Sequence, residues 1–323
     1  MLIWIIDEEW EDYNLEKEML PKLLPGVEIK YSGNDYAKDL EEFGYKADGI
    51  LAQVYVDIPR STIEKLENCK GIATYGGGFD RIDIEAAKEK EIMVANVQGY
   101  CAEDLADYVL ASMFYANKRI AQYSNNLNKD LEDGRWGATA AGEERHRLSN
   151  QTLLIVGFGT IGKVIGERAK SLGIEVIAYD EYFSKEDIEK YGVEKVDWEE
   201  GFKRADYVSI NLRGDDSNAN KIGMNEFELM KNSAYIINTS RGKIIKEEDL
   251  IKAVNEKIIA GAFLDVLKNE PPKLDDPMLK ERNIIITPHI SYISIESMGQ
   301  LKEIAITNLV NMVKGEKALY PVY

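Results

Sequence analysis

The stretch that most constrains the fold is residues 152–180, TLLIVGFGTIGKVIGERAKSLGIEVIAYD. The apolar run Leu153–Val156 predicts a buried strand, and the segment that opens after the glycines and runs to about Leu172 predicts a helix. Glu175–Tyr179 then predicts a second strand. A strand, a glycine-rich turn, a helix and a further strand form a βαβ unit, which places this part of the chain in a parallel α/β sheet.

The three glycines of this turn stand in the spacing G-x-G-x-x-G, and each has a physical role. Gly157 permits the tight turn, Gly159 lets the backbone approach a pyrophosphate, and Gly162 allows close packing of helix on strand. Thr160 and Ile161 open the helix, where free amides and the positive end of the helix dipole favour phosphate. The turn therefore predicts a dinucleotide site.

Asp180 ends the second strand, eighteen positions after the last glycine. Its carboxylate is placed to accept hydrogen bonds from the ribose hydroxyls of a bound adenosine, and it would repel a 2′-phosphate. No arginine or lysine occurs at 181–183, so NAD is favoured over NADP as the cofactor. Methyltransferases share this pattern, and glycine turns without any ligand are common, so the turn alone does not define a reaction.

Strand-like and helix-like segments alternate along the rest of the chain, which predicts two Rossmann-like or flavodoxin-like doubly wound parallel sheets with a cleft between them. The first series has fewer elements, so we expect the C-terminal helix, about 297–314, to return to it. The predicted domains are a discontinuous substrate domain, residues 1–98 plus 290–323, and an NAD-binding domain, residues 99–289. The predicted strands are 2–6, 49–54, 71–75, 92–95, 153–156, 175–179, 207–211, 234–238, 260–264 and 283–287.

Between a long helix predicted over 104–122 and the glycine turn, residues 123–151 are polar and irregular. A structureless stretch of this length is unusual inside a compact domain. We therefore expect an arm that lies over a neighbouring subunit, and with it a homodimer.

The composition argues against several partners. A formal net charge of −17 disfavours nucleic acid and anionic membrane surfaces. Two cysteines give neither a disulfide framework nor a metal-ligand spacing, and no metal site is predicted. The apolar run at 2–6 is too short for a signal peptide, so a cytoplasmic protein is expected.

The chain has only two histidines, His146 and His289. His289 follows the predicted strand 283–287, Arg241 follows the strand 234–238, and Glu270 lies beyond the strand 260–264. All three stand past strand carboxyl ends, the edge of such a sheet where ligands bind. Arg241 is suited to pair with a substrate carboxylate, His289 to donate a proton, and Glu270 to orient the imidazole and favour its protonated form. Singly, each is also typical of a structural or surface residue.

Four segments in order, VGFGTIG, INTSRGKIIKEEDLIKAV, GAFLDVLKNEPP and IIITPHIS, resemble the D-2-hydroxyacid dehydrogenase family. An upstream segment, IATYGGGFDRIDIEAAKEKEIMVANVQGYCAEDLADYVLA, resembles that family's substrate loop and crossover helix. Within this segment, the residues YC.ED.AD most resemble the branch that includes the C-terminal binding protein corepressors. The resemblance spans nearly the whole chain.

The resemblance implies the roles of Arg241, Glu270 and His289 given above. It also implies that backbone amides around Tyr75, Gly76 and Gly77 hold the substrate carboxylate beside Arg241. On the cofactor side it places two residues, Thr239 and Asp265, at the nicotinamide end, and two others, Asn211 and Leu212, under the adenosine.

The expected activity is thus the reversible reduction of a 2-oxo acid to a D-2-hydroxy acid with NADH, the D stereochemistry coming from the resemblance. The alternative is an NAD(H)-sensing scaffold that binds proteins and turns over little, as the corepressor branch would allow. The sequence does not identify the 2-oxo acid.

Overall fold

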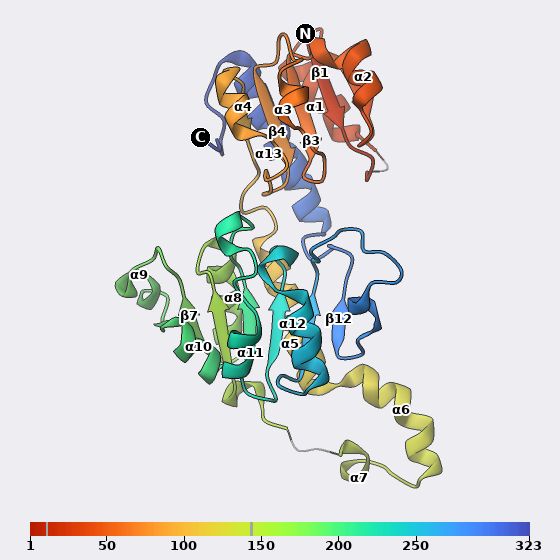
Figure 1. Ribbon diagram of the computed structural model, residues 1–323, viewed down its shortest axis with the longest axis vertical. Helices are drawn as coiled ribbons and strands as arrows, with labels where there is room; N and C mark the ends of the chain where they lie inside the picture. The colour runs from red at the N-terminus through yellow and green to blue at the C-terminus, as the bar shows by residue number, and fades with distance from the viewer. Residues whose placement is uncertain (11, 143–144) are drawn as a thin grey trace. The chain divides into compact units, whose positions relative to one another are not determined.

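The computed structural model describes residues 1–10, 12–142 and 145–323 (Figure 1). The chain forms two compact units. Unit 1 comprises Met1–Tyr100 and Ser294–Tyr323, and unit 2 comprises Cys101–Ile293. No helix in the described part of the chain combines the length and the apolar character needed to cross a membrane.

Unit 1 is built on a five-stranded sheet in the order β2-β1-β3-β4-β5, and every pairing between these strands is parallel. This is the flavodoxin-like order, with its switch point between β1 and β3. The strands are β1 (Leu2–Ile6), β2 (Glu28–Ser32), β3 (Gly49–Gln53), β4 (Gly71–Tyr75) and β5 (Met93–Ala95). The helices are α1 (Asn14–Leu23), α2 (Ala37–Glu42), α3 (Arg60–Ile63), α4 (Ile84–Glu89) and α13 (Ile295–Lys314).

The C-terminal helix α13 returns to unit 1, where it packs on β3 and β4. The first residue of β3 and the first residue of β4 are glycines, and both lie against this helix. A methyl group on Gly49 would stand 2.8 Å from the side chains of Leu309 and Val313, and one on Gly71 would stand 2.6 Å from Met312. Glycine at the start of each strand therefore lets the helix lie close to the sheet.

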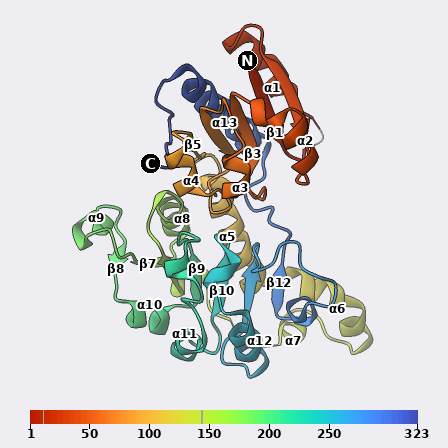
Figure 2. The ribbon, with the colours of Figure 1, turned by 45° about the horizontal axis from the view of Figure 1, so that its top comes forward.

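Unit 2 is built on a seven-stranded sheet in the order β12-β11-β10-β9-β6-β7-β8, again with parallel pairings (Figure 2). This order contains the Rossmann arrangement, with the switch point between β6 and β9. The strands are β6 (Thr152–Val156), β7 (Glu175–Tyr179), β8 (Glu194–Lys195), β9 (Tyr207–Ile210), β10 (Tyr235–Asn238), β11 (Gly261–Leu264) and β12 (Ile284–Ile286).

Helices cover both faces of this second sheet, because its strands bury side chains on both sides. Leu153 and Ile155 of β6 belong to the core under α5 (Ala102–Lys118) and α8 (Thr160–Ser171). Leu154 and Val156 of the same strand belong to the opposite core. That core lies under α10 (Trp198–Arg204), α11 (Met224–Leu229) and α12 (Glu247–Asn255), while the short helix α9 (Lys185–Glu189) precedes β8. The prediction of two doubly wound parallel α/β sheets is confirmed.

The polar segment after α5 is more ordered than the sequence predicts. The predicted helix ends early, at Lys118, because Arg119 adopts a left-handed backbone with φ of 47°. A new helix, α6 (Ile120–Glu132), follows directly, and α7 (Ala138–Ala141) comes after it. Figure 1 shows α6 and α7 extending away from the sheet of unit 2. Residues 143–144 of the predicted arm lie outside the described residues.

Candidate active site

Glu270 and His289 form a hydrogen-bonded pair in unit 2. His289 Nδ1 lies 2.8 Å from Glu270 Oε2, and Glu270 Oε1 accepts the backbone amide of Leu267 at 2.7 Å. Both side chains are largely buried, with 20% and 24% of their surface exposed for His289 and Glu270. Burial raises the pKa of Glu270, but the hydrogen bond and charge of His289, the Leu267 amide and the charge of Arg241 outweigh it and lower that pKa below its ordinary value.

The turn that carries His289 is held by Asp265, the first residue after β11. Asp265 is 1% exposed, and its carboxylate accepts the amides of Ile290 and Ser291 at 2.9 and 2.8 Å. The amide of His289 donates to the Asp265 carbonyl at 2.9 Å. His289 is held in a left-handed backbone conformation, φ 53°, which costs free energy for a residue with a side chain. Asp265 thus stabilises the turn, and its predicted nicotinamide contact stays a prediction.

Arg241 follows β10, and two glycines permit close contacts at this loop. A side chain on Gly214 would collide with the Arg241 stem, and one on Gly242 would collide with the backbone of Leu267 and Lys268. The close contact at Gly242 brings the loop of Arg241 against the loop of Glu270. Asn238, the last residue of β10, donates its side-chain amide to the Arg241 carbonyl at 2.9 Å. Sequence reading identified Arg241 but not these glycines, because the partners are distant in the chain.

The glycine turn lies between β6 and α8, and two of its glycines make close backbone contacts. Gly157 has φ of 96°, and a methyl group there would stand 2.6 Å from the Asn211 carbonyl oxygen. A methyl group on Gly162 would collide with the Gly157 carbonyl. At Gly159, by contrast, no described atom lies within 4 Å of the added methyl. Two glycines are therefore required by the fold, and the third borders open space at the start of α8, whose first residues are Thr160 and Ile161.

Asp180 stands directly after β7 and joins the turn to the next loop. One carboxylate oxygen accepts the Phe158 amide at 2.7 Å, and the other accepts the amides of Tyr182 and Phe183 at 2.8 and 3.1 Å. The side chain is mostly buried, with the residue 8% exposed. The ribose contact of Asp180 stays a prediction, and the structure shows that this side chain fixes the glycine turn.

The remaining predicted cofactor residues also follow strands of unit 2. Asn211 comes after β9, and its amide donates to the Val156 carbonyl at 2.7 Å. Its side-chain Nδ2 donates to Ser209, whereas its buried Oδ1 receives no hydrogen bond from the described part of the chain. Leu212 packs against the core beneath, and Thr239 follows β10, 9% exposed.

In unit 1, the predicted substrate turn comes directly after β4. The Gly76 carbonyl accepts Thr74 Oγ1 and the Val97 amide, both at 2.9 Å, and the Gly77 carbonyl accepts Asn96 Nδ2 at 2.8 Å. Gly76 has φ of 140°, in the region that favours glycine. Because these hydrogen bonds fix the carbonyls of Gly76 and Gly77, the turn has a defined shape.

The side chain of Tyr75 makes a buried polar contact with helix α1. Its hydroxyl donates to Oε1 of Glu16 at 3.0 Å, and Glu16 is fully buried. Lys302 Nζ lies 3.8 Å from the same oxygen. The sequence offered no signal for this contact, because its partners come from α1, β4 and α13.

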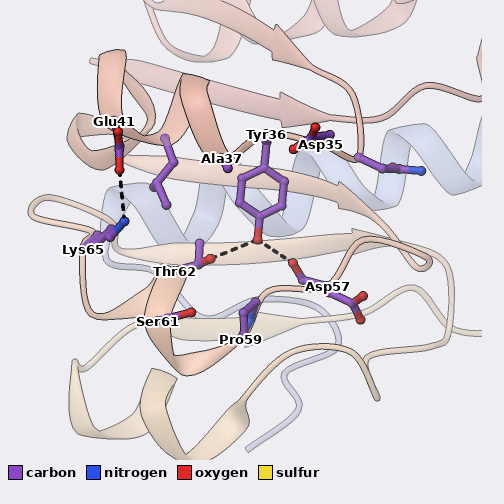
Figure 3. Close-up of a pocket in the computed structure, with 11 residues that line it drawn as sticks. Asp35, Tyr36, Ala37, Glu41, Asp57, Pro59, Ser61, Thr62 and Lys65 are labelled. Carbon is purple, nitrogen blue, oxygen red and sulfur yellow. Dashed lines mark hydrogen bonds and ion pairs between the residues drawn. The ribbon is translucent and has the colours of Figure 1, made fainter.

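A hollow of about 320 Å³ lies elsewhere in unit 1, between α2 and α3 (Figure 3). Three carboxylates line it, those of Asp35, Glu41 and Asp57, against a single lysine, Lys65. Arg81 pairs with Asp57 at 3.1 Å, outside the set of lining residues. None of the predicted site residues lines this hollow, and its acidic wall is unsuited to a carboxylate substrate.

Comparison with known proteins defines the class. Residues 110–291 match the family model described as D-isomer specific 2-hydroxyacid dehydrogenase, NAD binding domain. The chain is 33% identical over 276 residues to a glyoxylate reductase of Thermococcus litoralis, covering 84% of this chain and 82% of that one.

Two solved structures have the same fold. A protein of Thermus thermophilus aligns over all of both chains with a TM-score of 0.86 at 26% identity. The D-lactate dehydrogenase of Aquifex aeolicus, complexed with NAD and lactic acid, aligns over 97% of this chain and 96% of that one, with a TM-score of 0.84 at 25% identity. This chain belongs to the D-isomer specific 2-hydroxyacid dehydrogenase family and is an NAD-dependent oxidoreductase. Its branch within the family, including the predicted likeness to the corepressors, stays a prediction.

Proposed function

We propose that this protein reduces a 2-oxo acid to the D-2-hydroxy acid with NADH, and that Arg241, Glu270 and His289 carry the chemistry. The observation that supports this most is the imidazole–carboxylate pair of His289 and Glu270, 2.8 Å apart, beyond the strands of a sheet that also bears the dinucleotide turn. An NAD-sensing scaffold would have no use for such a pair.

The residues around the glycine turn fit NAD. The space beside Gly159 accommodates a pyrophosphate, and the first amides of α8 lack intrahelical partners. Asp180 supplies an acceptor for ribose hydroxyls, and Asn211 Oδ1, which no group among the described residues bonds, supplies another buried acceptor. When bound, NADH supplies the hydride, and Thr239 and Asp265 lie on the loops assigned to its nicotinamide end.

The proton comes from His289 in this proposal. Nδ1 is engaged by Glu270, so the proton transfer is assigned to the other ring nitrogen, Nε2. As C2 is reduced, the carbonyl oxygen would gain the electron pair of the C=O π bond and would take the proton from Nε2. Glu270, anchored by the Leu267 amide, keeps the ring oriented and compensates the imidazolium charge.

Arg241 is assigned to the substrate carboxylate. A guanidinium pairs bidentately with a carboxylate and also polarises the adjacent carbonyl group. The amides of the turn at Tyr75, Gly76 and Gly77 are assigned to the same carboxylate. Unit 2 would then be the NAD-binding domain predicted over 99–289, and unit 1 the substrate domain predicted over 1–98 plus 290–323.

We infer that the substrate is a small 2-oxo acid, of the size of glyoxylate or pyruvate. The support is the pair of relatives reported above, a glyoxylate reductase and a D-lactate dehydrogenase. The test is NADH consumption by the purified protein against a panel of small, branched, aromatic and phosphorylated 2-oxo acids, with NADPH in parallel. Tight NADH binding with no turnover of any acid would favour the scaffold instead.

A homodimer forms part of the proposal. Helix α6 exposes Ile120, Leu127 and Leu131 along one face, at 71%, 43% and 55%, and Trp136 beyond it is 72% exposed. Apolar side chains at such helical spacing are typical of a face that packs against another element. The second copy of this chain is the partner we infer for it. A cytoplasmic location and the lack of nucleic-acid and membrane partners stay predictions from composition.

A further inference from the structure

We propose that Tyr108 is a positioning residue for His289 and acts through Thr287 and Asp265. The proposal rests on the proposed role of His289 and adds a residue on a different element, helix α5. The Tyr108 hydroxyl lies 2.7 Å from Thr287 Oγ1, which in turn lies 2.6 Å from Asp265 Oδ1.

The direction of these hydrogen bonds follows from the available protons. The side chain of Asp265 acts only as an acceptor here, since it receives the amides of Ile290 and Ser291 as well as the Thr287 hydroxyl. Thr287 therefore donates its only hydroxyl proton to Asp265. Tyr108 must then be the donor to Thr287. Burial raises the pKa of Tyr108, so this hydroxyl stays protonated at neutral pH.

The network ends at the strained residue that the mechanism uses. His289 holds φ of 53°, and such a conformation persists only where its surroundings fix it. The His289 amide donates to the carbonyls of Asp265 and Thr287, at 2.9 and 3.0 Å. Tyr108 fixes Thr287, Thr287 fixes Asp265, and Asp265 fixes the turn on both sides of the histidine.

The position of Tyr108 in the chain gives this network a second consequence. Helix α5 begins at Ala102, just after the chain leaves unit 1 at Tyr100. The turn of His289 ends just before the chain returns to unit 1 at Ser294. The Tyr108–Thr287 hydrogen bond thus ties together, within unit 2, the two segments by which the chain enters and leaves it. Displacement of either segment is then shared by the other, and the histidine keeps its place beside Glu270.

The experiment removes the hydroxyl alone, with Tyr108→Phe, and Tyr115→Phe on the same helix is the matched control. We expect kcat for 2-oxo acid reduction to fall about 2- to 10-fold, the scale of one hydrogen bond. The Kd for NADH and the thermal midpoint should stay near wild type. Thr287→Ser keeps the hydroxyl and should retain kcat, whereas Thr287→Val should lose at least as much as Tyr108→Phe. Adding Tyr108→Phe to Thr287→Val should cost nothing further, because both changes break one chain of hydrogen bonds.

A second readout does not depend on turnover. Because the chain has only two histidines, ¹⁵N-histidine labelling gives two imidazole signals, with His146 as the internal reference. In Tyr108→Phe, the His289 signal should shift or broaden while the His146 signal stays fixed. Wild-type kcat together with an unchanged His289 signal would overturn the proposal, as would parallel losses of kcat and thermal midpoint with that signal unchanged. If the wild-type enzyme reduced no 2-oxo acid, the proposed function would fail, and the imidazole signal would still decide the role of Tyr108.

Discussion

Glu270 Oε2 and His289 Nδ1 stand 2.8 Å apart although the two residues are 19 positions apart in the chain. The contact exists because β11 and β12 are neighbours in a parallel sheet, so the loops that follow them meet at the same edge. Glu270 is held by Leu267, and the His289 turn is held by Asp265. The pair is therefore positioned from both sides before any substrate arrives.

The pH dependence of stability should report on Glu270. Its folded pKa is lowered, so its contribution to stability is present above the ordinary glutamate pKa of about 4.3 and is lost as pH falls through the lower folded value. The difference in unfolding free energy between the wild type and Glu270→Gln should shrink across that window. Urea titrations at several pH values measure it, and a difference that stays constant down to about pH 3 would contradict this assignment.

Arg241→Lys should chiefly damage substrate binding, because a lysine lacks the bidentate fork. We expect KM for the 2-oxo acid to rise by about tenfold or more, on the scale of a charge-assisted hydrogen bond. The Kd for NADH should change little. Arg81→Lys is the control, since Arg81 pairs with Asp57 on the surface. Equal effects of the two substitutions on KM would contradict the assignment of Arg241 to the substrate carboxylate.

Gly159→Ala should weaken NADH binding without destabilising the fold. No described atom lies within 4 Å of the added methyl, and the φ of Gly159 is −75°, so the substitution introduces no strain. The methyl would instead occupy the space assigned to the pyrophosphate. Gly299→Ala in α13 also meets no described atom within 4 Å and serves as the control. Fluorescence titration should give a higher Kd for NADH in Gly159→Ala than in Gly299→Ala. A Gly159→Ala protein that binds NADH as well as the wild type does would contradict the placement of the pyrophosphate beside Gly159.

Helix α6 provides the test of the dimer. Leu127→Asp with Leu131→Asp adds charge to its exposed apolar face and should yield monomers in light scattering. Glu132→Lys, at the end of the same helix, changes the charge while leaving that apolar face intact, and should leave the mass unchanged. A wild-type protein that elutes as a monomer, or a doubly substituted protein that keeps the dimer mass, would rule out α6 as the interface.

The sequence predicted best those elements whose signals are local. The strands β4 and β7 have their predicted bounds, because apolar, β-branched runs between turn residues are distinctive. The edge strand β2, Glu28–Ser32, escaped prediction because its face is largely exposed and its composition is polar. Helix α6 escaped for a similar reason, since its few apolar residues lie among asparagines and charges.

The same distinction applies to the site. Arg241, Glu270 and His289 could be identified because each follows a predictable strand, and because the family resemblance covers them. Tyr108 could not, because its proposed role depends on a hydroxyl contact between residues 179 positions apart. The buried contact of Glu16 with Tyr75 likewise joins residues 59 positions apart. Contacts of this kind depend on tertiary packing, which leaves no periodic signal in the sequence.

The measurement that tests the central claim most directly is steady-state reduction of a 2-oxo acid by wild type, His289→Ala and His146→Ala, with NADH Kd determined for each. General acid catalysis contributes about 10²- to 10⁴-fold. We predict that His289→Ala loses kcat on that scale while it binds NADH as the wild type does, and that His146→Ala retains full activity. A His289→Ala enzyme with near-wild-type kcat would show that another group donates the proton and would contradict the account.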